Sequence, residues 1–149
     1  MNKKGFDRES ALALFRKACH EHGLRITPQR TAVYTRLAQA EDHPNAESLH
    51  RRIMEQFPNI SLDTVNRTLL TLTRIGLASV VEGGGDPKRF DPDIELHHHA
   101  RCVECGKILD FYHEEYDNLG VPREIREKMN VIGKRVVIEG LCNGCRKVR

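Results

Sequence analysis

The sequence predicts an α+β protein made of two parts, and three observations carry that prediction. Apolar residues at helical spacing, with start and stop residues around each segment, dominate about half of the 149-residue chain. Two short strand-like segments around a glycine-rich turn follow them. After Pro92 the pattern changes to strand-like segments that flank two Cys-x-x-Cys pairs. We therefore expect one domain over residues 1–90 and a second over residues 91–149.

Three helices are predicted first, each from an apolar stripe and a boundary residue. The first ends at Gly23, and the second begins with Thr27 as its N-cap and Pro28 at its first position. The third follows Pro44 and ends at Pro58. The residues expected to face the core from these helices are Leu12, Phe15, Cys19, Ala32, Val33, Leu37, Leu49, Ile53 and Phe57.

A fourth helix is predicted from the N-cap Ser61 to Gly76, and two short strands follow within residues 78–92 around a Gly-Gly-Gly-Asp-Pro turn. Helices followed by a two-stranded ribbon describe a winged helix, whose last helix enters the DNA major groove. A plain helical bundle with a hairpin is the alternative. The residues expected inside are Val65, Leu69 and Leu72. The candidate DNA-contacting residues outside are Thr64, Asn66, Arg67 and Arg74, with Thr71 beside them.

Charge divides unevenly between the two parts. Up to Phe90 there are 14 Lys and Arg against 10 Asp and Glu, whereas the remainder has 10 against 11. A basic first part suits nucleic-acid binding and a near-neutral second part suits another task. A solvated surface would give the same asymmetry, so this is supporting evidence only.

The second part reads as a small α/β unit. Strands are predicted within residues 96–102 and 107–113, a helix over 122–130, and a long strand over 131–142. A unit of about 55 residues is too small to bury a generous core without a metal or a partner.

Composition excludes several classes of protein. Hydrophobic residues make up 39% and charged residues 30%, as in soluble globular proteins. No apolar run approaches the roughly 18 residues of a membrane span, so no membrane partner is expected. The first residues, MNKKGFDRE, contain no apolar core of a secretion signal. We therefore expect a cytoplasmic protein with reduced thiols.

Four cysteines have the spacing of a closed zinc site. Cys102 and Cys105 form one Cys-x-x-Cys, Cys142 and Cys145 form the other, and 36 residues separate them. Two disulfides, or unrelated thiols, are the alternative, and disulfides are disfavoured in a reducing compartment. Zinc binding in small sites is worth about 10–16 kcal/mol, against about 2–4 kcal/mol for a disulfide. We expect one structural zinc per subunit, and place Cys19 in the core.

Three adjacent histidines indicate a second metal site. On a strand His97 and His99 share one side and His98 takes the other. The oxygen donors nearby are Asp91, Asp93, Glu95 and Asp110. Imidazoles with carboxylates and no thiolate favour Fe(II), Mn(II) or Zn(II) over copper. A register shift of one residue would face Asp110 toward His98 instead, and a solvated histidine tract remains an alternative.

From about residue 10 to its end the chain resembles the ferric uptake regulator family. The matching segments are GLRITPQR (23–30), HPNAESLH (43–50), ISLDTVNRTL (60–69), RFD (89–91), HHHARCVECGKILDF (97–111) and the closing CNGC. Within the family, the pattern most resembles the peroxide-sensing repressors. The resemblance implies a homodimer that binds a double-stranded DNA operator, with residues 91–149 as its dimerisation domain.

The resemblance also implies one regulatory Fe(II) or Mn(II) per subunit. Its ligands would be His43, Asp91, His97, His99 and Asp110. Iron-sensing relatives tend to carry Glu at the positions of Asp91 and Asp110, and zinc-sensing relatives tend to use a cysteine that this chain lacks at the site. In the peroxide-sensing branch, peroxide reacting at bound Fe(II) leads to oxidation of a ligand histidine, here His43 or His97, and repression ends.

Two departures from the family pattern bear on function. Thr64-Val65-Asn66 stands where the family usually has Thr-Val-Tyr, and that Tyr contacts DNA in relatives. Asn can bond adenine bidentately, so we expect a changed sequence preference. Some relatives have an additional metal site with a histidine on the last long strand, but this chain has Lys134 there, so that site is not expected.

The leading hypothesis is a metal-dependent, peroxide-responsive transcriptional repressor, and an iron-responsive regulator is the alternative within the family. A non-haem metalloenzyme is a third hypothesis. Five protein ligands would leave it little room for substrate, and no separate acid–base or nucleophile group stands out. A fourth is a constitutive DNA-binding protein whose histidines merely duplicate the structural zinc.

Overall fold

The protein folds into two compact units, which divide between Ile94 and Glu95. The structure is a computed structural model that describes residues 5–82 and 87–148. We call the unit up to Ile94 the helical unit and the unit from Glu95 the sheet unit, and describe each by itself. Helices and sheets together make an α+β fold. None of the helices in the described ranges has the length and apolarity that a membrane crossing needs.

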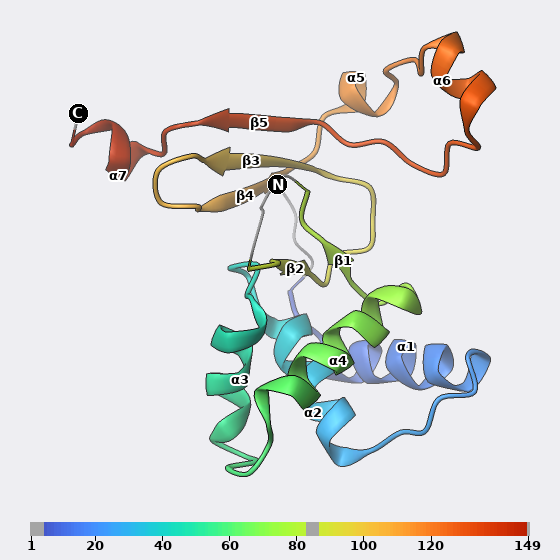
Figure 1. The fold of residues 1–149 in the computed structure, drawn as a ribbon, viewed down its shortest axis with the longest axis vertical. Coiled ribbons are helices and arrows are strands. Elements are labelled where there is room, and N and C mark those ends of the chain that lie inside the picture. The colour runs from blue at the N-terminus through green and yellow to red at the C-terminus, as the bar shows by residue number, and fades with distance from the viewer. Residues whose placement is uncertain (1–4, 83–86, 149) are drawn as a thin grey trace. The chain divides into compact units, whose positions relative to one another are not determined.

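The described residues of the helical unit form four helices, drawn from blue to green in Figure 1. They are α1 (Arg8–Glu21), α2 (Pro28–Gln39), α3 (Ala46–Met54) and α4 (Leu62–Arg74). The two predicted N-caps are confirmed. The side chain of Thr27 accepts a hydrogen bond from the Arg30 amide (3.2 Å), and that of Ser61 accepts one from the Thr64 amide (3.0 Å). These bonds satisfy amides that a helix start leaves without an intrahelical partner.

The apolar stripes of the four helices meet in one core. Its fully buried residues include Phe15, Cys19, Val33, Leu37, Leu49, Ile53, Val65, Leu69 and Leu72, all of which were expected there. Leu12 and Phe57 are only half-buried. The stripe of α1 runs through Ala11, Phe15 and Cys19, which leaves Leu12 at its margin, and Phe57 lies beyond the end of α3.

A two-stranded antiparallel ribbon completes the helical unit. Strand β1 (Ser79–Val80) pairs with β2 (Phe90–Asp91), with Val80 opposite Phe90. The predicted glycine-rich turn between them falls on residues 83–86, which lie outside the described residues. Phe90 is buried, and its amide donates to the carbonyl of Pro44 (3.0 Å). Strand β2 is therefore attached to the segment that enters α3.

The sheet unit is built on three strands in the order β4-β3-β5 (Figure 1). They are β3 (His98–Cys102), β4 (Ile108–Phe111) and β5 (Val137–Gly140). Strand β4 runs antiparallel to β3, and β5 runs parallel to it. Three short helices accompany the strands: α5 (Glu114–Asp117), α6 (Arg123–Lys128) and α7 (Asn143–Arg146).

The sheet unit departs from the sequence prediction at three elements. The long strand expected over residues 131–142 is reduced to β5, because β3 has only five residues and the rest of the segment has no strand to pair with among the described residues. Helices α5 and α7 were not predicted, since helices of four residues carry too little periodicity to be recognised.

Strand register assigns the side chains to two faces of the sheet. Ala100 lies opposite Leu109 on one side and Ile138 on the other, so these three share one face. Leu109 is 49% exposed and Ile138 is 44% exposed. His99 lies opposite Asp110 and therefore points to the other face. We call Leu109, Ala100 and Ile138 the apolar row.

Candidate metal centres

The four paired cysteines converge at one end of the sheet unit. Their sulfur atoms all lie within 4.8 Å of one another, and we call Cys102, Cys105, Cys142 and Cys145 the cysteine cluster. Cys102 ends β3, and the turn after it is closed by Gly106, at φ 74°, whose amide donates to the Cys102 carbonyl (2.9 Å). That positive φ favours glycine.

The spacing of the sulfurs fits a tetrahedral zinc ion. The sulfurs of Cys105 and Cys142 are 3.7 Å apart, and four thiolates about 2.3 Å from one zinc ion would be about 3.8 Å from each other. All five cysteines of the chain are free thiols, so the disulfide alternative is not observed.

The electrostatics of the cysteine cluster also favour a cation. Backbone amides of Cys105 and then Cys142 donate to the Cys102 sulfur and lower its pKa to about 6. The sulfurs of Cys142 and then Cys105 beside Cys145 raise the pKa of that thiol to about 12. Several thiolates therefore cannot ionise together at this spacing unless a positive ion offsets their charge.

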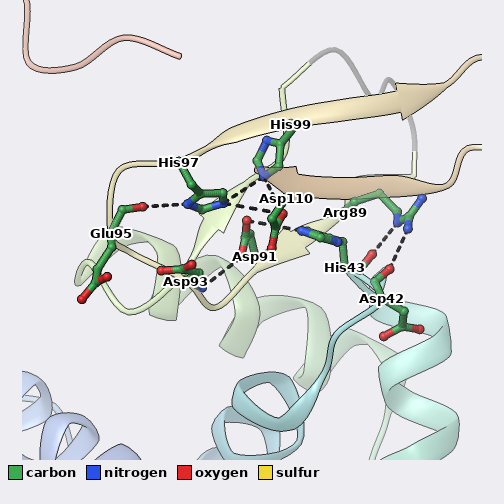
Figure 2. Close-up of polar contacts among 9 residues, drawn as sticks. All are labelled: Asp42, His43, Arg89, Asp91, Asp93, Glu95, His97, His99 and Asp110. Carbon is green, nitrogen blue, oxygen red and sulfur yellow. Dashed lines mark hydrogen bonds and ion pairs between the residues drawn. The ribbon is translucent and has the colours of Figure 1, made fainter. Parts of the chain in front are cut away.

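A second group of donors lies on the sheet unit and contains no thiol. We call His97, His99 and Asp110 the histidine cluster; all three are buried. The Nε2 atoms of His97 and His99 are 3.0 Å apart, and Asp110 Oδ1 lies 3.3 Å from His99 Nε2 and 3.7 Å from His97 Nε2 (Figure 2). The pairing of His99 with Asp110 rules out the alternative register in which Asp110 would face His98.

The tautomer of His97 suits metal binding. Its Nδ1 lies 2.7 Å from the carbonyl oxygen of Glu95, which can only accept, so Nδ1–H is the donor. The lone pair is then on Nε2, the atom that faces His99 and Asp110. A backbone carbonyl that fixes the tautomer in this way is usual for a metal-ligating histidine.

A further histidine–carboxylate pair belongs to the helical unit. His43 Nε2 lies 3.4 Å from Asp91 Oδ2, and both residues are buried (Figure 2). His43 directly precedes Pro44, and Asp91 ends β2. The second carboxylate oxygen of Asp91 accepts from the Asp93 amide (2.9 Å), which orients the group.

His98 points away from the histidine cluster, as strand alternation predicts. Its Nδ1 accepts from the Val136 amide (3.1 Å), so its Nε2–H donates to the carboxylate of Asp117 (2.7 Å). The ring also packs against Phe111 and Tyr116. His98 thus connects β3 to α5 and to the segment before β5. Sequence reasoning missed Asp117 because its helix was not predicted.

The candidate DNA-contacting residues on α4 differ in their surroundings. Asn66, Arg67 and Arg74 are exposed. Arg67 forms an ion pair with Asp63 (2.9 Å), one turn earlier on the helix. Thr64 is half-buried, and its hydroxyl forms a hydrogen bond with the Ser61 hydroxyl (2.8 Å). Its side chain is therefore less available to contact DNA than those of Asn66, Arg67 and Arg74. Asn66 also lines a groove of about 710 Å³ within the helical unit.

Known proteins align with this chain over most of its length. The model of the ferric uptake regulator family matches residues 21–139. The peroxide-responsive repressor PerR of Staphylococcus epidermidis is 33% identical over 139 residues, which cover 93% of this chain and 90% of that protein. The protein of the same name from Staphylococcus saprophyticus is 35% identical over 124 residues, covering 83% and 84%.

Solved structures of a ferric uptake regulator and of a PerR protein also align with this chain. The Helicobacter pylori ferric uptake regulator Fur, described with three functional metal-binding sites, aligns with a TM-score of 0.77 at 27% identity over 97% of both chains. PerR from Streptococcus pyogenes, described as a peroxide sensor, aligns with a TM-score of 0.52 at 28% identity over 91% of this chain and 92% of that one. The chain belongs to the ferric uptake regulator family.

Proposed function

We propose that this chain is a metal-dependent transcriptional repressor that binds DNA as a homodimer and responds to peroxide. The observation that carries the proposal is the separation of donor types. The histidine cluster and the His43–Asp91 pair contain nitrogen and oxygen donors and no thiol, whereas the cysteine cluster contains four thiols. Relatives more than 30% identical over most of the chain are peroxide-responsive repressors.

The helical unit, within the proposed domain of residues 1–90, would act as a winged helix. Four helices followed by a two-stranded ribbon support this assignment, with α4 as the helix that enters the major groove. Asn66, Arg67 and Arg74 are exposed on α4 and would contact DNA, with Thr64 at the edge of the contact. Relatives of this fold include a zinc uptake regulator solved with DNA.

The remaining residues, 91–149, would form the dimerisation domain with its structural zinc. The cysteine cluster has the donors and spacing for one zinc ion per subunit. The apolar row leaves two large side chains exposed on one face of the sheet. Covering that row with the same row of a second subunit would remove its apolar area from water.

The regulatory site would join donors from both units. We assign His43, Asp91, His97, His99 and Asp110 as ligands of one Fe(II) or Mn(II) ion per subunit. Three imidazoles and two carboxylates would neutralise a divalent ion and favour these metals. Such an ion would hold the two units in one arrangement. Converting a mostly open population to a mostly closed one takes about 5.5 kcal/mol of differential affinity.

The peroxide response would follow from the ligand types. Bound Fe(II) supplies reactivity toward hydrogen peroxide, and Mn(II) does not. With no thiol in the proposed ligand set, the histidines are the ligands open to oxidation, and the resemblance to the peroxide-sensing repressors assigns this role to His43 or His97. An oxidised imidazole binds the ion poorly, so the repressor would leave its operator.

The test is a gel shift combined with mass spectrometry of the full-length protein. We expect DNA binding with Fe(II) or Mn(II) and little without either metal. Modest hydrogen peroxide should release DNA from the Fe(II) form and add one oxygen atom to the peptide with His43 or the one with His97. The Mn(II) form should stay bound and unmodified. Oxidation restricted to the cysteine cluster would contradict the proposed sensor.

An iron-responsive regulator is the second candidate, favoured by the alignment with Helicobacter pylori Fur over nearly the whole chain. Against it, this chain has aspartate at positions 91 and 110, where iron-sensing relatives tend to carry glutamate. The same experiment separates the two. If the Fe(II) form keeps its DNA and intact histidines under peroxide, the iron-responsive assignment replaces the first. Family members are regulators and not enzymes, so the metalloenzyme hypothesis is set aside.

A further inference from the structure

We propose that Arg89 is a positioning residue for His43: one guanidinium holds both peptide groups that flank His43 and so directs its imidazole. The inference rests on the proposed function, in which His43 and Asp91 are metal ligands. Every contact in the argument lies within the helical unit.

Arg89 donates to two consecutive backbone carbonyls. Its Nε–H donates to the carbonyl of His43, and its NH2 group donates to the carbonyl of Asp42 (2.7 Å) (Figure 2). These carbonyls belong to the peptide groups on either side of the His43 Cα atom. Because guanidinium donors have a fixed planar arrangement, holding both carbonyls restricts both backbone torsions of His43.

The backbone at His43 requires such support. Its φ is 49°, and in the described ranges it is the one non-glycine residue with a positive φ. Few non-glycine residues adopt that conformation, and the residue before a proline is restricted further. A strained conformation of this kind persists where its surroundings hold it, and such places are often functional sites.

Arg89 is itself fixed by the ribbon. Its carbonyl accepts from the Val81 amide (2.9 Å), and it forms an isolated bridge with Asn45, the N-cap of α3. Arg89 and Asp91 are two residues apart on an extended segment, so their side chains leave it on the same side. The segment that presents the Asp91 carboxylate therefore also sets the His43 imidazole, whose Nε2 lies 3.4 Å from Asp91 Oδ2.

The test measures Mn(II) affinity of the full-length, zinc-containing protein by calorimetry. We expect R89A to weaken Mn(II) binding at least about tenfold, the usual minimum for losing a group that orients a ligand. R36A is the matched control, since Arg36 pairs with Glu55 (3.5 Å) elsewhere in the same unit. It should bind Mn(II) like the wild type. If R89A does not fold, R89K replaces it, because a point charge cannot hold two carbonyls in a fixed geometry.

A double-mutant cycle separates positioning from a general loss of stability. If Arg89 acts through His43, R89A should weaken Mn(II) binding no further in an H43A background, although it still lowers the melting temperature. Wild-type affinity in R89A, or an equal loss with and without His43, would overturn the inference. D91N tests the proposed site separately. Weak binding by D91N with normal binding by R89A removes only the role of Arg89, whereas normal binding by D91N removes the proposed site and the inference with it.

Discussion

The cysteine cluster and the proposed regulatory ligands differ in which units of the chain supply them. The cysteine cluster is complete within the sheet unit, and its four sulfurs come from the end of β3, the turn after it and the segment after β5. The nitrogen–oxygen donors are divided between units. His97, His99 and Asp110 belong to the sheet unit, while His43 and Asp91 belong to the helical unit.

That difference separates stability from regulation. A metal whose ligands all lie in one unit adds its binding free energy to the folding of that unit. A metal whose ligands lie in two units adds its binding free energy to one arrangement of those units, and can act as a switch. Thiolates hold zinc without redox change, whereas imidazoles and carboxylates accept the redox-active Fe(II).

The largest effect is expected from opening the cysteine cluster. Cys102→Ser or Cys142→Ser should abolish zinc binding and unfold the sheet unit, because structural zinc contributes about 10–16 kcal/mol in small sites. Zinc content, thermal melting and oligomeric state measure the outcome. Cys19→Ser is the matched control: Cys19 is buried in the helical unit, so this variant should keep its zinc. A Cys102→Ser protein that remains dimeric with unchanged melting would mean that the cluster is not a stabilising site.

Removing a nitrogen or oxygen donor should affect the switch and leave the fold intact. We expect His97→Ala or Asp110→Asn to lose most Mn(II)-dependent operator binding, up to the roughly 5.5 kcal/mol of the conformational shift, with normal zinc content. Gel shifts across a Mn(II) titration measure this. His98→Ala is the control because its side chain bonds Asp117 and not the cluster. Equal losses in His97→Ala and His98→Ala would contradict the division between regulatory and structural histidines.

The smallest effects are expected on α4, which carries none of the proposed metal ligands. Arg67→Ala should weaken operator binding by about 1–3 kcal/mol, the range for a single specific base contact. Asn66→Tyr should change sequence preference more than overall affinity, because it restores the residue usual in the family at that place. Fluorescence anisotropy and selection from random duplexes measure the two. Asp63→Ala is informative beside them, since Asp63 pairs with Arg67. Unchanged affinity in Arg67→Ala would move the recognition surface away from this helix.

Local features could be predicted from sequence because their partners are close along the chain. The caps at Thr27 and Ser61 bond amides three residues later, and each Cys-x-x-Cys is defined by its own spacing. Alternation on a strand was enough to separate His98 from His97 and His99. The register that places Asp110 opposite His99 could not be predicted. A shift of one residue between the two strands, which would face Asp110 toward His98, fits the same sequence pattern.

The contacts that hold the site residues in place were not predictable for a different reason. Arg89 lies 46 residues from His43 along the chain, and Asp117 lies 19 residues from His98 on a helix too short to recognise. Such partners are brought together by the tertiary fold and leave no periodicity in the sequence. The family resemblance named candidate ligands, and the structure adds the residues that orient them.

The position of β5 has a consequence for amide hydrogen exchange. Within the described ranges, β5 pairs with β3 alone, in parallel, and residues 112–136 separate it from β4 along the chain. Strand β4, by contrast, follows β3 after a short turn. Closing the longer loop costs more chain entropy, and the second cysteine pair lies directly beyond β5. When zinc is chelated, the Val103 and His99 amides, which donate to the Gly140 and Val136 carbonyls, should lose protection first. The amides that pair β3 with β4 should exchange later. Zinc removal would therefore detach β5 from β3 before the β3–β4 hairpin opens.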